Sequence, residues 1–338
     1  MRRRITLGLV FALSAMIVLP LSLPAKQNGQ EEATSVIEKA RGLTDIRAKG
    51  SPSFHLWATV CLLNLSGGEV DGKYEEFRSS SGQWRRAFEF PDVKYLQIEV
   101  GDESKMWSAT PARYDPYVIF CLKQTLALGA YLKIGKHERV VKFSRRGVAQ
   151  TLMSCAELKS GKGAKRQVCF DPSTGTLLRA QSTGVARQAC EYSDYAPMEN
   201  RFFPRVMREI EFGKAFIEVR VNEIVPQTQF DPSLFSPPAG ALNWPVCSDP
   251  EPPRHLEKPE PYYPSEARNK RISGMVLIYI VIGTDGRAYN ALPVKADERS
   301  LAASTLDMIT RHCLFQPATC NGIPVPFTSF VKTAFRLR

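Results

Sequence analysis

The stretch that decides the fold is YPSEARNKRISGMVLIYIVIGTDG, which runs from Tyr263 to Gly286. Pro264 suits the first turn of a short helix, SEARNKR, and Gly274 suits its end. MVLIYIVI reads as a strand, and the TDGR that follows it predicts a hairpin turn into AYNALPVKA. Farther along, SLAASTLDMITRHC has helical periodicity and PVPFTSFVKTAFRLR alternates as a strand does. The order helix, strand, strand, helix, strand predicts a small α+β sandwich at residues 261–338.

The chain before this unit divides into three parts. Residues 1–25 open with three arginines and continue as an uncharged apolar run, the pattern of a cleaved export signal or of a retained membrane anchor. Both alternatives place the rest of the chain outside the cytoplasm, either soluble or anchored to a membrane by residues 5–25. Residues 26–235 begin with an amphipathic helix and continue as short alternating strands, which predict an antiparallel sheet closing towards a half-barrel. One stretch, PYVIFCLKQTLALGAYLK, suits a helix at least as well as a strand.

Residues 236–260 are a proline-rich linker in this interpretation. Proline recurs every few residues from Ser236 as far as Pro264, which favours extended polyproline II geometry. Such a stretch is expected to form neither helix nor sheet, so it predicts a stiff tether between two domains.

The terminal unit resembles the C-terminal domain of the TonB family, the energy-transducing proteins of Gram-negative envelopes. The resemblance covers Pro261 to Arg338 and rests on YP-x-x-AR, a strand that opens with glycine, the DG turn, F-x-P-A and G-x-P-V. The residues that carry it are Tyr263, Pro264, Ala267, Arg268, Gly274, Asp285, Gly286, Phe315, Pro317, Gly322, Pro324 and Val325. Where the family usually has a tryptophan, two residues before the phenylalanine of F-x-P-A, this chain has Cys313.

The resemblance implies that the last strand binds a peptide of a TonB-dependent outer-membrane receptor by strand addition. A strand that ends the chain is also expected at a sheet edge, where free backbone groups accept an extended peptide. The candidate contacts, with Lys332 and Arg336 supplying charge, are Phe327, Ser329, Phe330, Val331, Lys332, Thr333, Ala334, Phe335 and Arg336. The alternative is an edge covered by a homodimer partner or by the other domain. Members of the family that transduce energy through inner-membrane motor proteins usually have a histidine in the membrane anchor and a long proline-rich spacer. This chain has no histidine before His55 and its spacer is short, so the sequence argues against such coupling.

A second resemblance, to LolA-like carriers of outer-membrane lipoproteins, covers the larger domain. It rests on GKYEEF, QWRRAFEFP, a VGD run and DPSLFSPPAGA. It implies a curved antiparallel sheet, covered by helices, that encloses an apolar cavity. The alternative function is therefore a periplasmic carrier of lipid or lipoprotein, with the terminal unit for docking. The aromatic residues of these strands fit either a cavity lining or an ordinary sheet core; they are Trp57, Trp84, Phe88, Phe90 and Trp107.

The eight cysteines are expected to form disulfides, because exported proteins fold in an oxidising compartment. Cys155 and Cys169 flank a polar turn and are one candidate pair; Cys313 and Cys320 are another. The sequence leaves the pairing of the other four open. It has no P-loop, His-Glu-x-x-His or Gly-x-Ser-x-Gly motif, so we expect neither an enzyme nor a metal or cofactor. The net charge of +11 is read as a solvated basic surface, with no nucleic acid partner. The alternative is an anionic partner outside the cytoplasm, such as anionic lipid, lipopolysaccharide or cell-wall polymer.

Overall fold

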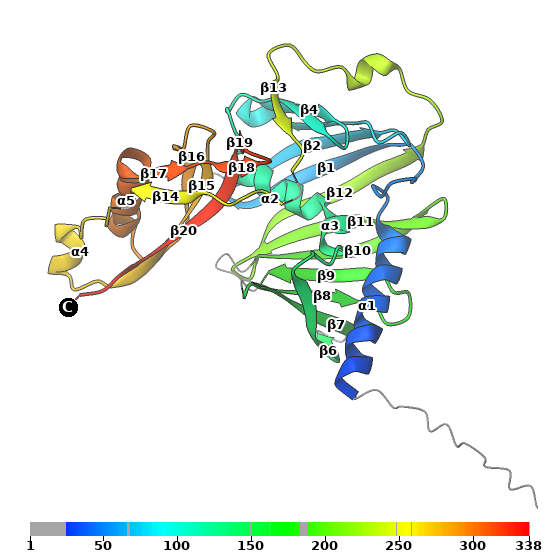
Figure 1. Cartoon of the computed structure of the whole chain (residues 1–338), viewed down its shortest axis with the longest axis horizontal. Coiled ribbons are helices and arrows are strands. Elements are labelled where there is room, and N and C mark those ends of the chain that lie inside the picture. Colours follow the sequence, from blue (N-terminus) through cyan, green and yellow to red (C-terminus); the bar gives the residue numbers. More distant parts are fainter. Residues whose placement is uncertain are drawn as a thin grey trace, which may run out of the picture.

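The computed structural model describes residues 25–65, 68–148, 151–161, 163–182, 188–247, 249–257 and 259–337. The predicted export signal or anchor lies outside this part of the chain, apart from its last residue. In the described ranges no helix combines the length and the apolar character needed to cross a membrane. The chain folds into a large curved sheet with helices across one face and a smaller unit beside it (Figure 1).

The large sheet has thirteen strands, all antiparallel to their neighbours, in the order β13-β5-β4-β3-β2-β1-β12-β11-β10-β9-β8-β7-β6. Tight turns join most of them; Phe212 and Gly213, for example, have φ of 47° and 85° between β11 and β12, as a two-residue hairpin turn requires. This confirms the predicted curved antiparallel sheet. The strands are β1 (Phe54–Leu65), β2 (Gly68–Arg78), β3 (Trp84–Phe90), β4 (Tyr95–Gly101), β5 (Lys105–Ala109), β6 (Glu138–Val148), β7 (Thr151–Ser160), β8 (Lys165–Phe170), β9 (Leu177–Ser182), β10 (Gln188–Met198), β11 (Arg201–Glu211), β12 (Lys214–Pro226) and β13 (Leu242–Pro245).

Three helices pack on the inner face of this sheet: α1 (Ala25–Thr44), α2 (Tyr117–Leu126) and α3 (Leu128–Tyr131). Two short 3-10 turns, η1 (Pro91–Val93) and η2 (Pro232–Phe235), lie in the connections. In α1 the buried residues Ala33, Ile37 and Ala40 recur at helical spacing. Together with Leu122 of α2 they join one continuous core cluster with side chains of the sheet, including Phe54, Leu56, Val60, Phe88, Phe170 and Val219. The space between the helices and the sheet is therefore filled by side chains.

The smaller unit contains α4 (Ser265–Asn269), β15 (Gly274–Ile282), β16 (Ala288–Ala296), α5 (Arg299–Asp307) and β20 (Phe327–Phe335), which confirms the predicted element order. Its sheet has the order β16-β15-β20. The central strand β15 is buried on both faces: Ile278 and Ile280 pack towards α5, whereas Tyr279 and Val281 join the core of the large domain. Burial on both faces explains why MVLIYIVI is apolar throughout.

Short elements connect α5 to β20. After the turn η3 (Met308–His312) come β17 (Leu314–Gln316), β18 (Ala318–Cys320) and β19 (Ile323–Val325), and the last two pair as a hairpin.

The prediction that the proline-rich stretch forms no sheet is wrong. β13 pairs with β5 and extends the large sheet, and β14 (Arg254–Glu257) pairs with β17 of the smaller unit. The prolines do not prevent this, because Pro245 ends an edge strand and β14 contains none. The stretch is thus bound to both domains and is no free tether.

Candidate functional site

The strand β20 lies at the edge of the smaller sheet. It pairs with β15 over its whole length, from Phe327 opposite Ile282 to Phe335 opposite Gly274. Among the described residues no strand pairs with its other side. Its nine residues therefore leave a row of backbone N–H and C=O groups along an open margin.

The two faces of β20 have different surroundings. Val331 and Phe335 point towards α5 and pack with the core of the smaller unit. On the opposite face the ring of Phe330 lies 6.2 Å from that of Tyr117 and 6.1 Å from that of Phe120, both in α2. One face of the strand is thus needed for the fold of the unit, and the other is covered by the large domain at Phe330.

The predicted contact residues consequently differ in what they offer a peptide. Lys332, Ala334 and Arg336 are exposed, and Phe335 is only 5% exposed because it packs edge-on against Tyr263. The remaining five are half-buried: Phe327, Ser329, Phe330, Val331 and Thr333. The structure gives the side chain of Phe335 a place in the core, so only its backbone belongs to the open edge.

The residues of the TonB-like motifs hold the unit together. Ala267 and Phe315 are buried in its core, and the hydroxyl group of Tyr263 donates a hydrogen bond to the carbonyl oxygen of Ile272. Gly286 has φ of 75°, and its carbonyl accepts a hydrogen bond from the Phe315 N–H at 3.0 Å. A Cβ at Gly286 would lie 2.0 Å from the carbonyl oxygen of Phe315. The motifs therefore shape the unit that presents β20.

The smaller sheet is fixed to the large domain by polar contacts as well as by aromatic rings. Tyr279 is fully buried, and its hydroxyl group donates to the backbone oxygen of Asp115 at 2.9 Å. Asn290 Nδ2 donates to the backbone oxygen of Tyr114 at 2.7 Å. Burial, reinforced by the nearby carboxylate of Asp115, raises the pKa of Tyr279 well above its usual range. A buried hydroxyl group needs such a partner, so these contacts fix the orientation of the unit.

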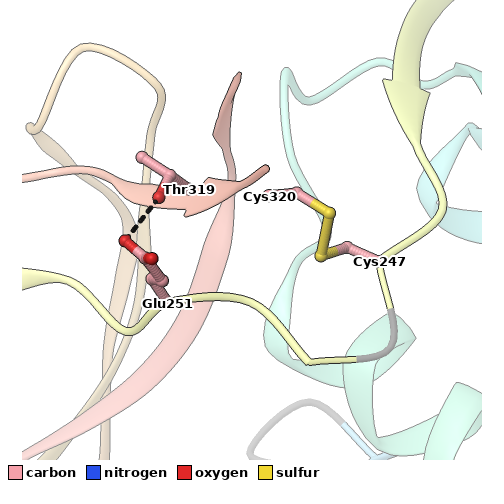
Figure 2. Close-up of a disulfide and its surroundings, with 4 residues drawn as sticks. All are labelled: Cys247, Glu251, Thr319 and Cys320. Atoms are coloured by element: carbon pink, nitrogen blue, oxygen red, sulfur yellow. Dashed lines mark hydrogen bonds between the residues drawn. A yellow bond between two sulfur atoms is a disulfide. The ribbon is translucent and has the colours of Figure 1, made fainter. Parts of the chain in front are cut away.

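A disulfide between Cys247 and Cys320 joins the proline-rich stretch to the β18–β19 hairpin (Figure 2), with the Cα atoms 6.0 Å apart. Next to it, Glu251 and Thr319 exchange two backbone hydrogen bonds, of 2.9 and 3.2 Å. The Thr319 hydroxyl group also donates to Glu251 Oε2 at 3.1 Å. The linker is therefore held against the smaller unit by covalent and hydrogen bonds together.

The structure corrects the predicted Cys313–Cys320 pairing. Cys320 ends β18, where it meets the linker, whereas Cys313 directly follows η3 and its Sγ lies 3.1 Å from Met308 Sδ. The other candidate pair, Cys155 and Cys169, forms a disulfide between directly opposite residues of β7 and β8.

A cavity of about 200 Å³ lies at the domain junction, beside the start of β20. Pro326, Thr328 and Val281 line it from the smaller unit, and Trp244 and Lys123 line it from the large domain. It is open to solvent on part of its surface. The cavity therefore lies between the two domains, next to the N-terminal end of β20.

Four charged residues line this cavity: Lys123, Glu99 and Asp115 pair with one another, whereas Arg113 lies over the rings of Tyr114 and Tyr289, 5.5 Å from each ring centre. Lys123 Nζ lies 2.5 Å from Glu99 Oε1 and 2.5 Å from Asp115 Oδ2. Gln97 Nε2 donates to both carboxylates, at 2.8 Å each. Burial alone would raise the pKa of Glu99, but Arg86 and Lys123 hold it at about 2. Glu99 is therefore ionised at neutral pH and is neutralised by its two basic partners.

The aromatic residues considered for a lipid cavity are divided between core and surface. Phe88 and Phe90 are buried in the main core cluster. Trp57, Trp84 and Trp107 are half-buried, and Trp57 lines an open groove together with Glu75, Lys73 and Asn222. None of these positions places an aromatic ring around an enclosed apolar space.

Sequence reasoning missed the junction residues Tyr279, Tyr114, Asp115 and Trp244, and it missed Cys247 as the partner of Cys320. One of them has a visible signal: Tyr279 is the single polar side chain in MVLIYIVI. A hydroxyl group in an otherwise aliphatic buried strand requires a hydrogen-bond partner from outside the sheet. Here that partner is the backbone oxygen of Asp115, in the large domain.

Comparison with known proteins agrees with the resemblance of the C-terminal unit to the TonB family. Residues 259–337 match the family model of the Gram-negative bacterial TonB protein C-terminal domain. The sequence has no match among curated proteins. The C-terminal unit is therefore similar to a domain of envelope proteins that acts through protein–protein contacts.

Solved structures similar to the N-terminal part of the chain include a LolA superfamily protein and a lipoprotein-sorting domain. A LolA superfamily protein from Nitrosomonas europaea is 11% identical, with a TM-score of 0.43, and the match covers 60% of this chain and 97% of that one. An outer membrane lipoprotein-sorting protein domain from Vibrio parahaemolyticus is 11% identical, with a TM-score of 0.42 and coverage of 62% and 97%. A DUF1329 family protein from Desulfovibrio piger is 10% identical, with a TM-score of 0.47 and the same coverage.

Proposed function

We propose that this protein is a periplasmic adaptor of the Gram-negative envelope that binds an extended peptide of an outer-membrane receptor along β20. The observation that carries the proposal is the open edge of this strand, which pairs with β15 alone among the described residues. Strand addition at such an edge forms backbone hydrogen bonds that need no particular peptide sequence. The match of the unit to the TonB C-terminal family supports the same use of the edge.

The role we propose is binding and not catalysis. Two of the three glutamates that are buried in the described part of the large domain are engaged in structural ion pairs, and the third, Glu209, accepts a hydrogen bond from the Thr125 hydroxyl group at 2.8 Å. Glu76 accepts hydrogen bonds from Arg47 Nε at 2.9 and 3.0 Å and from the Tyr74 hydroxyl group at 2.8 Å. Glu99 is neutralised by Arg86 and Lys123. Such pairs orient the helices on the sheet, and neither carboxylate is left as an acid or base for a substrate.

The fixed linker argues for a rigid adaptor over an extending energy transducer. An energy transducer of the TonB type is expected to reach its receptor on a long spacer. Here the disulfide Cys247–Cys320 and the pairing of β13 and β14 hold the spacer on the protein. We therefore propose that the peptide is bound to one compact body, with no dependence on motor proteins.

The carrier alternative receives no specific support. A lipid carrier needs an apolar space between sheet and helices, and here that space is filled by residues such as Ile37, Leu122 and Phe88. Binding an acyl chain would require these side chains to move apart.

Cross-linking of a bound peptide tests the proposal. The matched positions are Lys332 on β20 and Lys295 on β16, because both are exposed and both stand opposite Leu277 in the register. A synthetic receptor peptide with a benzophenone at its centre is expected to label residues around Lys332 and to leave those around Lys295 unlabelled. Lys332→Glu should weaken binding of an acidic peptide severalfold, and Lys295→Glu should not.

Two results would contradict the proposal. Equal labelling of the two edges would show that β20 has no special role. Cross-links between β20 strands of two copies, unaffected by excess peptide, would show that the edge is a homodimer interface.

A further inference from the structure

We propose that the cavity beside the start of β20 receives one aromatic side chain of the bound peptide, so that the large domain helps to select the peptide. This rests on the proposed strand addition. It adds a pocket that depends on both domains, at a place where the TonB-like unit alone would have only a flat sheet.

The position of the cavity along the strand supports this use. Thr328 lines it and stands opposite Val281, which lines it as well. Directly paired residues on neighbouring strands direct their side chains to the same face of the sheet, with Cβ atoms about 5 Å apart. A peptide residue paired with Thr328 on the open side would therefore direct its side chain towards the large domain, where the cavity lies.

The next position along the same face offers no comparable space. Two residues on, Phe330 is covered by the rings of Tyr117 and Phe120. Beyond it Lys332 is exposed. A peptide laid along β20 therefore passes one hollow, and the side chain at that register is the one that the large domain can distinguish.

The size and walls of the cavity fit an aromatic ring. A cavity of about 150 Å³ is enough to hold benzene, and this one measures about 200 Å³. Trp244 and Val281 contribute apolar walls, and the Tyr114 ring lies 5.9 Å from that of Trp244. An aromatic side chain of the peptide could pack against these two rings edge-to-face or offset-stacked, as aromatic rings prefer.

The charges at the cavity argue against a basic side chain. Lys123 is paired with both Glu99 and Asp115, and these carboxylates also accept hydrogen bonds from Gln97. A basic peptide side chain would lose its hydration without finding an unpaired carboxylate, and it would stand near Arg113, which also lines the cavity. Tyrosine or phenylalanine would bury its ring, and the Ser108 side chain in the lining carries a hydroxyl group that a tyrosine could meet.

The test uses the full chain and a set of nine-residue threonine–valine peptides, each with Phe, Tyr, Ala or Lys at one position. Fluorescence anisotropy gives the affinity of each peptide. At one position, Phe or Tyr is expected to bind roughly tenfold to a hundredfold more tightly than Ala, and Lys no more tightly than Ala. Thr328→Trp fills the cavity from β20 and should abolish this preference while the Ala peptide still binds. Leu292→Trp, an exposed position on β16, is the control and should leave the preference unchanged.

The outcomes separate this proposal from the one on which it rests. If all peptides bind the wild-type protein alike at every position, the pocket is refuted and strand addition stands. If no peptide binds at all, strand addition itself is refuted. If Thr328→Trp fails to fold, Trp244→Ala replaces it, because removing an aromatic wall should reduce the preference for Phe; an unchanged preference would refute the pocket.

Discussion

Removal of the Cys247–Cys320 disulfide should destabilise the C-terminal unit without affecting the large sheet. The double variant Cys247→Ser, Cys320→Ser opens a loop that spans 73 residues of sequence and contains β15, β16 and α5. In the chain-entropy treatment, closing a loop of this length stabilises the folded state by about 4 kcal/mol. The Cys155–Cys169 bond spans 14 residues, so the same treatment gives it about 3 kcal/mol.

Amide hydrogen exchange measures the effect strand by strand. The amides of Ile278 and Ile280 in β15 are buried in the smaller unit, so they exchange through opening of that unit. In the double variant their exchange should accelerate by up to roughly three orders of magnitude, since each 1.4 kcal/mol is tenfold. The buried amides of β12, such as that of Val219, should keep their rates.

The matched control is the variant Cys155→Ser, Cys169→Ser, which should accelerate exchange around β7 and β8 and leave β15 unchanged. If β15 exchanges at the wild-type rate without the Cys247–Cys320 bond, then packing alone holds the unit. The claim that the linker is a structural clamp would be refuted.

Three further predictions concern stability. Gly286→Ala should cost about 3 kcal/mol or more in urea unfolding, since it combines a positive φ with a Cβ pressed onto the Phe315 carbonyl. Gly322→Ala, at φ 81° in open space, should cost only about 1–2 kcal/mol. Burial raises the pKa of Glu209 from 4.5 to about 7, so the folded state favours its protonated form. The unfolding free energy should therefore fall as pH rises from about 5 to 8, by up to about 3 kcal/mol from this group, and Glu209→Gln should flatten that part of the profile. Phe330→Ala should lower the unfolding free energy of the C-terminal unit by about 2 kcal/mol through its lost contacts with α2, and an unchanged value would show that the junction contributes nothing.

The order of elements in the C-terminal unit could be predicted because its signals are local. Pro264 is the N-cap residue of α4, and Gly274 is the first residue of β15. The Asp285-Gly286 pair turns the chain between β15 and β16. Each of these positions is read from its neighbours in sequence, and the hydrophobic runs between them have a clear length and period. The alternating pattern of PVPFTSFVKTAFRLR predicts the strand β20, and the sheet order β16-β15-β20 leaves it paired on one side only among the described residues.

The course of the linker could not be predicted because it depends on distant parts of the chain. Leu242–Pro245 and Arg254–Glu257 are too short to have a period, and each becomes a strand only because β5 or β17 offers an edge to pair with. The short spacing between Cys313 and Cys320 suggests that they form a disulfide. In the structure Cys320 lies in the β18–β19 hairpin and is bonded to Cys247, which is distant in sequence. Proline content reports the local preference of the backbone, and here tertiary pairing overrides it.

The disulfide also determines how a load on β20 would pass through the protein. The start of β20 is joined by the short β18–β19 hairpin to Cys320, and Cys320 is bonded to Cys247, just after the strand β13 of the large sheet. A pull on a peptide bound at this edge would therefore reach the large sheet through covalent bonds, without passing through residues 249–257 or β14. The linker between the two cysteines cannot be drawn out while the bond is intact. Because the linker cannot extend, the edge of β20 stays at a fixed position next to the large domain. We therefore assign this edge to a fixed adaptor, in which the large domain bears part of the load and contributes to peptide selection.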